Sequence, residues 1–414
     1  MYSFSQEHFM RNPKELRKVF KKLDRQLIRQ LKNMVLNNFY HYQPTRIHFG
    51  CGQLNELPEI ASFYGRKFLL VTPYENMALK PMFDRVKQLM TQAGYDLVNF
   101  QKVTPNPVMP MIDEAIKLAH ENNVEAIIAL GGGSAIDTAK IIAYCAKAGI
   151  ADWNELMIKQ SPFVFSSKNP DALPLIAVPT TSGTGSQVTQ CAVVSAANNL
   201  KHGIHRREFF PDEAIVDPEL MQSLPYSLTA STAFDAFCHL SESAMKNSLS
   251  PVAMPLAENA LGMIIDTLPA MRHHPTIEGR INLAVADTMA GICLANAGGG
   301  LPHHFGEMIT SAIPTVNHGQ SLAISFPAFV KLYYTDQRYH DFLFKLLHRI
   351  DHRFCENDDL AEGMRILHEF MKSIDLDLRI SSFKPTDQEL RVLDGFIAQD
   401  KQAECLAILK NECI

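Results

Sequence analysis

The sequence predicts an α/β domain with a mostly parallel sheet, followed by an all-α domain. Three observations support this fold class. The length of 414 residues suggests about two domains. Short apolar runs alternate with helical segments as far as residue 222, whereas helical periodicity dominates from Ser227 onward. With 46% hydrophobic and 20% charged residues, the composition is that of a globular protein with a large core.

The first 40 residues stand apart from the rest of the chain. Apolar residues recur there at steps of three and four, which predicts an amphipathic helix: Leu16, Phe20, Leu23, Leu27, Leu31 and Met34. The same stretch holds nine Lys or Arg against three Asp or Glu. We expect residues 1–40 to form a helical extension that packs on the body of the protein and keeps a solvated basic face. A partner-binding or oligomerising helix is the alternative.

Residues 41–222 are predicted to form the α/β domain. Three apolar runs read as strands: "RKFLLVT", "EAIIAL" and "LPLIAVP". Helical segments such as "PMFDRVKQLMTQAG" and "MIDEAIKLAHENN" lie between them. Strands that alternate with helices favour a parallel sheet. Ligands of such sheets bind beyond the carboxyl ends of the strands.

Residues 223–414 are predicted to be helical. Segments such as "LAENALGMIIDTLPAM", "RINLAVADTMAGICLANA" and "EGMRILHEFMKSI" carry the helical period. The change of character after "DPELMQSLP" places the domain boundary near residue 222.

Bulk properties exclude several classes of protein. The net charge of −5 argues against nucleic acid as a partner. No apolar run approaches the ~20 residues that a membrane span needs, and the N-terminus lacks the pattern of a secretory signal. The eight cysteines are scattered without a CxxC pair. We therefore expect a cytoplasmic protein in a reducing compartment, with no membrane or nucleic-acid partner.

Two loops that follow predicted strands suit a phosphate-bearing ligand. In "EAIIALGGGSAIDTAK", three glycines lead from a strand into a helix that Ser134 could cap, and the free N–H groups there favour a pyrophosphate. A tight strand-to-helix turn is the alternative. "VPTTSGTGSQVT" follows the next strand and places hydroxyl groups around two glycines. Such loops are common singly, so the pair is better evidence than either one.

A third feature is a set of potential metal ligands. Asp235 and His239 lie four residues apart in a predicted helix, so they share one face. "GGGLPHHFGEMITSAIPTVNHGQ" adds His303, His304 and His318. Three neutral imidazoles and a carboxylate suit a borderline divalent ion, iron(II) or zinc. Taken alone, the Asp235–His239 pair is more typical of a buried structural hydrogen bond than of a metal site.

Together these motifs resemble the iron-containing (group III) alcohol dehydrogenase family, of the dehydroquinate synthase-like superfamily. The resemblance covers nearly all of residues 44–330 and keeps the family order. It rests on "PTRIHFGCGQLNELPE", "GGGSAIDTAK", "PTTSGTGSQVT", "KHGI", "AIVDPELMQSLP", "FDAFCHLSES" and "NAGGGLPHHFGE…NHG". It implies the dehydroquinate synthase-like architecture, with the metal between a dinucleotide-binding domain and a helical domain. The implied activity is hydride transfer between an alcohol or aldehyde substrate and NAD or NADP.

The resemblance also implies individual site residues. The metal ligands would be Asp235, His239, His318 and either His303 or His304; helix phase favours His303. Residues along the pyrophosphate would be Gly132, Gly133, Ser134 and Asp137. Residues along the ribose and nicotinamide would be Thr180, Thr181, Thr184, Val193 and Lys201. We also expect a homo-oligomer, a dimer.

Three departures from the family pattern keep alternatives open. Glu307 stands where many members carry a histidine or tyrosine that assists proton transfer. Pro73 replaces an aspartate that often meets the adenosine ribose in NAD-specific members, so NADP is as plausible as NAD. Gln187 replaces the usual glutamate. The alternatives are a polyol- or phosphate-substrate member of the superfamily, or a nucleotide-binding scaffold that has lost catalysis. No Lys or Arg lies in residues 234–243 or 298–326, which argues against a phosphate substrate.

Overall fold

The computed structural model describes residues 39–74, 79–149, 152–156, 172–196, 201–246, 248–355 and 358–414. Residues 41–414 form one compact unit. The amphipathic helix predicted from the first 40 residues falls within residues 1–38, outside the described residues. Among the helices that are described, none alone combines the length and the apolar composition needed to cross a bilayer.

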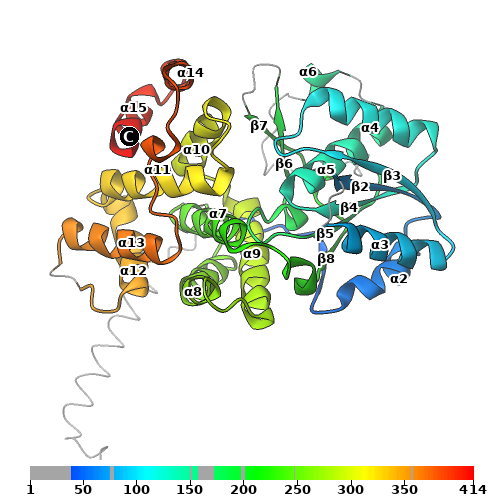
Figure 1. The fold of residues 1–414 in the computed structure, drawn as a ribbon, viewed down its shortest axis with the longest axis horizontal. Helices are drawn as coiled ribbons and strands as arrows, with labels where there is room; N and C mark the ends of the chain where they lie inside the picture. Colours follow the sequence, from blue (N-terminus) through cyan, green and yellow to red (C-terminus); the bar gives the residue numbers. More distant parts are fainter. Residues whose placement is uncertain are drawn as a thin grey trace, which may run out of the picture. The chain divides into compact units, whose positions relative to one another are not determined.

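The first half of this unit is built on a six-stranded sheet in the order β1-β8-β5-β4-β2-β3, with every described pairing parallel. Figure 1 shows the sheet between two layers of helices. Its strands are β1 (Arg46–Phe49), β2 (Lys67–Pro73), β3 (Asp96–Val103), β4 (Ala126–Gly131), β5 (Leu175–Pro179) and β8 (Glu213–Val216). The three strands predicted from apolar runs are β2, β4 and β5. In β4 and β5 every residue is buried, as expected for the centre of a parallel sheet.

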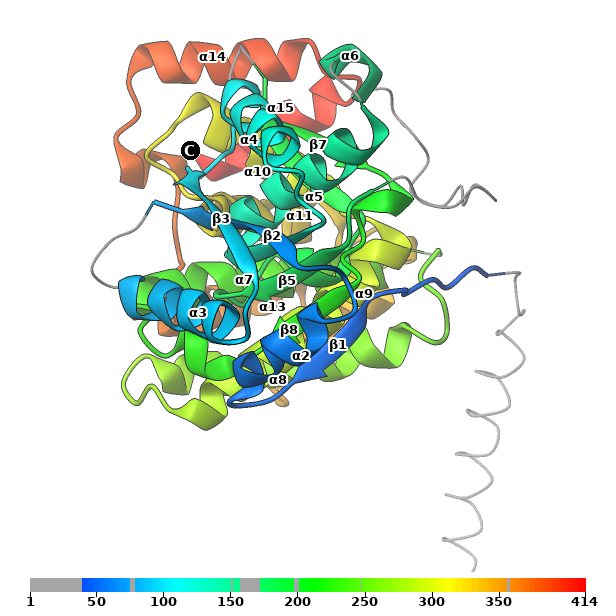
Figure 2. The ribbon, with the colours of Figure 1, turned by 90° about the vertical axis from the view of Figure 1, so that its right-hand side faces the viewer.

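Alternating residues of the strands build two separate cores. Leu69 and Ile127 pack with α4 (Met109–Glu121) and α5 (Gly133–Ala148) on one face. Phe68 and Ile128 pack with α2 (Leu57–Ala61) and α3 (Lys80–Gln92) on the other. Figure 2 shows β3 and β2 side by side at one margin of the sheet, with α3 alongside. Burial on both faces explains why these strands are continuously apolar.

Short elements complete this half. An antiparallel pair of strands, β6 (Cys191–Ser195) and β7 (Lys201–His205), stands beside the main sheet. The remaining elements are η2 (Gln53–Glu56), α6 (Trp153–Leu156), η3 (Ser186–Val188), η4 (Arg207–Phe209) and η5 (Pro218–Met221).

The second half is helical throughout its described residues. Its elements are α7 (Tyr226–Ala244), α8 (Met254–Met271), α9 (Ile277–Ala297), α10 (Leu301–Ala312), α11 (His318–Tyr333), α12 (Gln337–Ile350), α13 (Leu360–Ser373), η6 (Ile380–Phe383), α14 (Asp387–Ala398) and α15 (Ala403–Cys413). The parallel sheet followed by helices confirms the predicted fold class.

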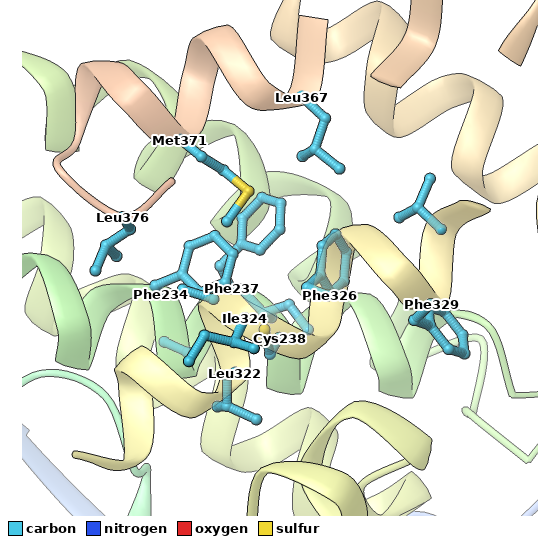
Figure 3. Packing of buried hydrophobic residues seen from close by; sticks show 14 of the residues in the cluster. Phe234, Phe237, Cys238, Leu322, Ile324, Phe326, Phe329, Leu367, Met371 and Leu376 are labelled. Carbon is cyan, nitrogen blue, oxygen red and sulfur yellow. The ribbon is translucent and has the colours of Figure 1, made fainter. Parts of the chain in front are cut away.

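Helix α7 lies at the centre of the helical half and is buried along almost its whole length. Figure 3 shows its aromatic face against α11 and α13. Phe234 and Phe237 stack with ring centroids 5.2 Å apart, and the ring of Phe326 meets Phe237 edge-on at 5.4 Å. Leu367 and Met371 of α13 belong to the same cluster. This packing fixes the rotation of α7 about its axis and so determines where its polar side chains point.

Candidate metal and dinucleotide site

The first cofactor loop is the turn from β4 into α5. Gly131 has a φ of +155°, and a Cβ added there would lie 2.7 Å from the Cβ of Ala135. Only glycine fits this turn without strain. The N-cap of α5 is Gly132, whose lack of a side chain leaves the helix N-terminus without a side-chain cap. The prediction that Ser134 caps the helix is wrong, because the helix begins one residue earlier and places Ser134 inside its first turn.

The second loop packs directly against the first. The backbone N–H of Thr180 donates to the Gly131 carbonyl at 3.0 Å. A Cβ at Gly132 would lie 3.1 Å from Thr181 Oγ1, and one at Gly133 would lie 2.7 Å from Thr184 Cγ2. The two loops predicted separately from the sequence therefore pack closely together at the carboxyl ends of β4 and β5, the edge at which parallel sheets bind their ligands.

A buried polar network, formed by side chains of α5 and the second loop, supports these two loops. Asp137 of α5 accepts hydrogen bonds from Ser186 Oγ at 2.5 Å and from the backbone N–H of Val193 at 2.9 Å. Lys140, one helical turn further, donates to Ser186 Oγ at 2.8 Å and to the Cys191 carbonyl at 2.6 Å. Burial lowers the pKa of Lys140 to about 8, against the opposing effect of Asp137. The network ties α5, the second loop and β6 into one rigid support.

The predicted metal ligands meet around one carboxylate oxygen. Oδ1 of Asp235 lies 3.1 Å from His303 Nε2, 3.6 Å from His239 Nδ1 and 3.7 Å from His318 Nε2. The rings of His239 and His303 stack at 4.2 Å, and the rings of His303 and His318 lie 5.4 Å apart. Ligand atoms of Asp235, His239 and His303 all fall within 4.8 Å of one another. Residues from α7, α10 and α11 thus converge on one point.

Burial and mutual charge set the protonation of this cluster in the metal-free protein. Burial lowers the pKa of His239 to about 4 and that of His318 to about 3, although Asp235 acts in the opposite direction. Burial would raise the pKa of Asp235, but the surrounding imidazoles outweigh it and bring that pKa to about 2. The cluster therefore offers an ionised carboxylate and two neutral imidazoles with free lone pairs.

The two adjacent histidines of α10 have different partners. His303 Nδ1 donates to Glu242 Oε1 at 2.6 Å, while its Nε2 faces Asp235. Burial would lower the pKa of His303, but Glu242 and Asp235 raise it to about 10. His304 Nε2 instead bonds Asp400, between α14 and α15, at 2.8 Å. A carboxylate on the distal nitrogen is the usual way that a metal-binding histidine is oriented.

Glu242 was not identified as a site residue from the sequence. It is buried on α7, three residues after His239, and its second oxygen accepts a hydrogen bond from the Gly300 backbone N–H. It thereby joins α7 to the first turn of α10. Its spacing from Asp235 and His239 puts it on their helix face, which is the signal that could have found it.

His318 opens α11 directly after a capping box. The Asn317 side chain accepts from the Gln320 backbone N–H at 2.9 Å, and the Gln320 side chain accepts from the Asn317 backbone N–H at 3.0 Å. This fixes the start of the helix and so the position of His318. The Nδ1 of His318 is buried without a hydrogen-bond partner among the described residues.

Both parts of the site open into one cavity of about 680 Å³. The predicted residues that line it are Gly133, Ser134, Asp137, Thr184, Val193, Lys201, Asp235, His239, His303 and His318. Gly132, Thr180 and Thr181 are not among the lining residues. The wall also includes His304, Glu307, Lys246 and the turn 298–300, none of which was assigned to the predicted site with a definite role. A cavity that joins a glycine-rich helix N-terminus to a His/Asp cluster can hold a dinucleotide and a metal ion together.

Two lysines that lie outside residues 234–243 and 298–326 also line this cavity. Lys201 begins β7, and Lys246 lies just beyond the end of α7. The ammonium of Lys246 is occupied, since it donates to the carbonyls of Ala297, Gly298 and Gly299. It stabilises the turn before α10. Tertiary folding therefore brings to the site basic groups that residues 234–243 and 298–326 lack, so their absence from these two segments does not exclude a phosphate substrate.

The residues present fit both groups that the architecture implies. A carboxylate with neutral imidazoles and no hydroxyl or amide is a donor set for iron(II) or zinc. The uncapped N-terminus of α5, where Gly133 and Ser134 line the cavity, fits a pyrophosphate.

Comparisons with known proteins point to one family. Residues 44–218 match the family described as Iron-containing alcohol dehydrogenase, and residues 229–396 match the Fe-containing alcohol dehydrogenase family, C-terminal. The long-chain primary alcohol dehydrogenase AdhA of Thermoanaerobacter ethanolicus is 32% identical over 293 residues, covering 69% of this chain and 72% of the relative. The NAD-dependent methanol dehydrogenase of Bacillus methanolicus is 30% identical, covering 70% and 74%.

The fold is also similar to that of a solved structure. The archaeal halo-thermophilic Red Sea brine pool alcohol dehydrogenase ADH/D1, bound to NZQ, is 27% identical and superposes with a TM-score of 0.81. The match covers 91% of this chain and 99% of that one.

Proposed function

The chain belongs to the iron-containing alcohol dehydrogenase family, and from that premise we propose that Asp235, His239, His303 and His318 hold its divalent metal ion. The observation that carries this proposal is the convergence of three imidazoles within 3.7 Å of one Asp235 oxygen. Iron(II) is the expected ion and zinc the alternative.

The protein is an NAD(P)-dependent alcohol dehydrogenase. A hydride passes between the alcohol carbon and the nicotinamide, and the hydroxyl proton leaves the alcohol, so that an aldehyde or ketone and the reduced cofactor result. A bound divalent metal supplies Lewis-acid polarisation of the substrate oxygen. The residues of the chain supply position and charge.

We propose that His303, rather than His304, is the middle ligand. The Nε2 of His303 faces Asp235, and its proton on Nδ1 is fixed by the buried Glu242. His304 is turned toward Asp400. Glu242 would act as a positioning residue, because it selects the tautomer of His303 and holds the turn before α10 through Gly300.

The cofactor would lie across the two loops. Gly132, Gly133 and Ser134 form the first turn of α5, where uncapped N–H groups suit the pyrophosphate. Asp137 would position that turn through Ser186 and Val193. Thr184, Val193 and Lys201 would line the cavity toward the ribose and nicotinamide, and Thr180 and Thr181 belong to the adjoining loop. The Asp137–Lys140 network keeps this side of the cavity rigid when the cofactor enters.

Turnover and metal content test this proposal together. The purified full chain should be analysed for iron and zinc and assayed with NADH and NADPH against a panel of aldehydes and ketones. We expect about one metal ion per chain, oxidation of a reduced cofactor, and loss of both metal and turnover in Asp235→Ala. The exposed Asp387→Ala serves as the control. Asp235→Ala that keeps its metal contradicts the ligand assignment.

We also propose the domain division, the cellular compartment and the oligomeric state of the protein. The division into residues 41–222, which bind the dinucleotide, and 223–414, which bind the metal, agrees with the last strand ending at Val216 and α7 beginning at Tyr226. Eight free cysteines favour the cytoplasm. A homodimer is expected, and light scattering on the purified protein checks it.

A further inference from the structure

The second loop is attached to the helical half by two buried side chains that lie 100 residues apart in the sequence. Gln187 of η3 and Asp287 of α9 are each 1% exposed. The side-chain amide of Gln187 donates to Asp287 Oδ2 at 2.8 Å, and the backbone N–H of Gly185 donates to Asp287 Oδ1 at 2.8 Å. Both carboxylate oxygens of Asp287 are therefore bound by donors of the same loop.

The buried charge of Asp287 depends on these bonds. Among the residues that the structure describes, none forms an ion pair with Asp287, whose favourable partners are N–H groups of the second loop. A buried carboxylate that loses its donors is costly. A shift of the loop away from α9 is therefore opposed by the loss of both hydrogen bonds, and the loop is held at a defined distance from the helix.

The same loop contacts α7 and borders the cavity. The carbonyl oxygen of Gly183 lies 3.3 Å from His239 Nδ1, and a Cβ added at Gly183 would lie 2.4 Å from the carbonyl oxygen of Thr232. Thr184 and Ser186 of the loop line the cavity. The contacts with α7 and α9 therefore determine how far the hydroxyl groups of Thr184 and Ser186 reach toward a bound dinucleotide.

The residue types at positions 187 and 287 depend on each other. The sequence departs from the family pattern at Gln187. A glutamate there would bring a second carboxylate to Asp287, and two buried carboxylates at hydrogen-bond distance disfavour each other's charge. An amide that faces a carboxylate supplies the missing donor. The contact therefore requires one amide and one carboxylate.

We propose that Gln187 and Asp287 are positioning residues for the dinucleotide, because their hydrogen bond sets the position of the second loop beside the cavity. The requirement is an amide opposite a carboxylate, in either order. The proposal rests on the proposed function, since the second loop must contact the bound cofactor. Neither Gln187 nor Asp287 lines the cavity, so both act through the residues of the loop that do.

An exchange of the two chemical groups tests this proposal. The dissociation constants of NADH and NADPH should be measured by fluorescence titration of the full chain as wild type, Gln187→Glu, Asp287→Asn and the double variant. We expect Gln187→Glu to weaken the preferred cofactor by about tenfold or more, because two carboxylates then meet. Asp287→Asn should weaken it less, because the Gln187 amide can turn its oxygen toward the new donor. The double variant should return to within about threefold of the wild type, since an amide again faces a carboxylate.

Metal content and kinetics separate positioning of the cofactor from general packing. Gln187→Glu should raise KM for the cofactor more than it lowers kcat, and should keep the metal content of the wild type. The exposed Gln92→Glu is the control for an added charge and should bind NADH as the wild type does. Gln187→Met removes the donor without adding a charge and should weaken NADH by about fivefold. It tests the hydrogen bond even if Gln187→Glu does not fold.

Three outcomes overturn the proposal. A double variant that binds NADH no better than Gln187→Glu shows that the two side chains do not act as a pair. Wild-type affinity in both Gln187→Glu and Gln187→Met has the same force, as does a parallel loss of metal and NADH. A wild type that binds neither NADH nor NADPH is a different result, because it contradicts the proposed function itself.

Discussion

At the scale of single residues, the adjacent His303 and His304 differ clearly in the side chains that they contact. They differ by 100° of helix rotation, which sends one ring to Asp235 and the other to Asp400. Only His303 has the arrangement of a ligand, with one nitrogen facing the cluster and the other held by a buried carboxylate.

Alanine at each position should separate the two roles. His303→Ala should weaken metal affinity by at least the 10–100-fold typical of losing an outer-shell partner alone. His304→Ala should retain the metal and lose about 1 kcal/mol of stability with its bond to Asp400. Metal content after dialysis, measured by mass spectrometry, decides the question. Retention by His303→Ala with loss by His304→Ala would reverse the assignment.

His239 predicts a pH dependence for the metal-free protein. Burial lowers its folded pKa to about 4 from the ordinary 6.5. The unfolded chain therefore takes up a proton below pH 6.5 that the native state refuses until near pH 4, so stability falls as the pH falls through this window. Between pH 7 and 5 the contribution is about 2 kcal/mol.

Urea unfolding of the chelator-treated protein at pH 7 and at pH 5 measures this change in the free energy of unfolding. The wild type should lose about 2 kcal/mol more than His239→Gln between pH 7 and 5, whereas the exposed His273→Gln should follow the wild type. Parallel pH profiles for the wild type and His239→Gln would show that the imidazole is not held neutral by burial.

At the scale of elements, α7 serves two purposes with opposite faces. Asp235, His239 and Glu242 point to the site, while Phe234 and Phe237 enter the aromatic core. Phe326 of α11 contacts both rings, at 6.0 and 5.4 Å (Figure 3). Because α11 also begins with His318, this contact links the positions of two ligand-bearing helices.

Removing the Phe326 ring should therefore cost stability and metal together. Phe326→Ala should reduce the free energy of unfolding by about 3–5 kcal/mol and weaken metal binding as the helices shift. Phe63 is 76% exposed, and Phe63→Ala should stay within about 0.5 kcal/mol of the wild type. Denaturant unfolding gives the energies. A variant at Phe326 that is as stable as the one at Phe63 would show that the ring is not part of the core.

The elements also show how far the sequence could predict the fold. Strands β2, β4 and β5 are buried on both faces, so they appear as apolar runs. Strand β3 was not recognised because it lies at the sheet edge, where three of the eight residues in "DLVNFQKV" are exposed and only two are buried. The four-residue β8 is too short to show a period. Helices of the second half were recognisable from their length and periodicity.

The site was predictable where its residues share a local motif. Asp235 and His239 are paired by helix spacing, and the glycine loops by their place after strands. The bond of Glu242 to His303 and the entry of Lys201 and Lys246 into the cavity depend on how distant elements pack. Sequence periodicity gives the apolar face of a helix but not its rotation and height against a neighbour.

At the scale of the whole molecule, the second cofactor loop and the helical half meet at two glycines. A Cβ at Gly291 of α9 would lie 2.6 Å from Val188 Cγ2 and 2.7 Å from the Gly185 carbonyl oxygen. Gly185 itself has a φ of +60°, and its backbone N–H donates to the buried Asp287 at 2.8 Å. The close approach holds the second loop against α9, which in turn packs on α7, the helix that carries Asp235 and His239.

Gly291→Ala should therefore separate the two halves of the active site. The added methyl forces α9 and the loop apart and should cost about 1–3 kcal/mol of stability. It should also lower kcat/KM for alcohol and cofactor together, because the distance between the proposed dinucleotide loop and the Asp235 cluster changes. A Cβ added at Gly395 of α14 would meet no atom within 4 Å, so Gly395→Ala should leave activity unchanged and add up to about 1 kcal/mol through helix propensity. Steady-state kinetics and thermal unfolding of both variants test the argument. Equal activity in the two would mean that the spacing of the halves is set elsewhere, by contacts that tolerate a methyl group between Gly185 and Gly291.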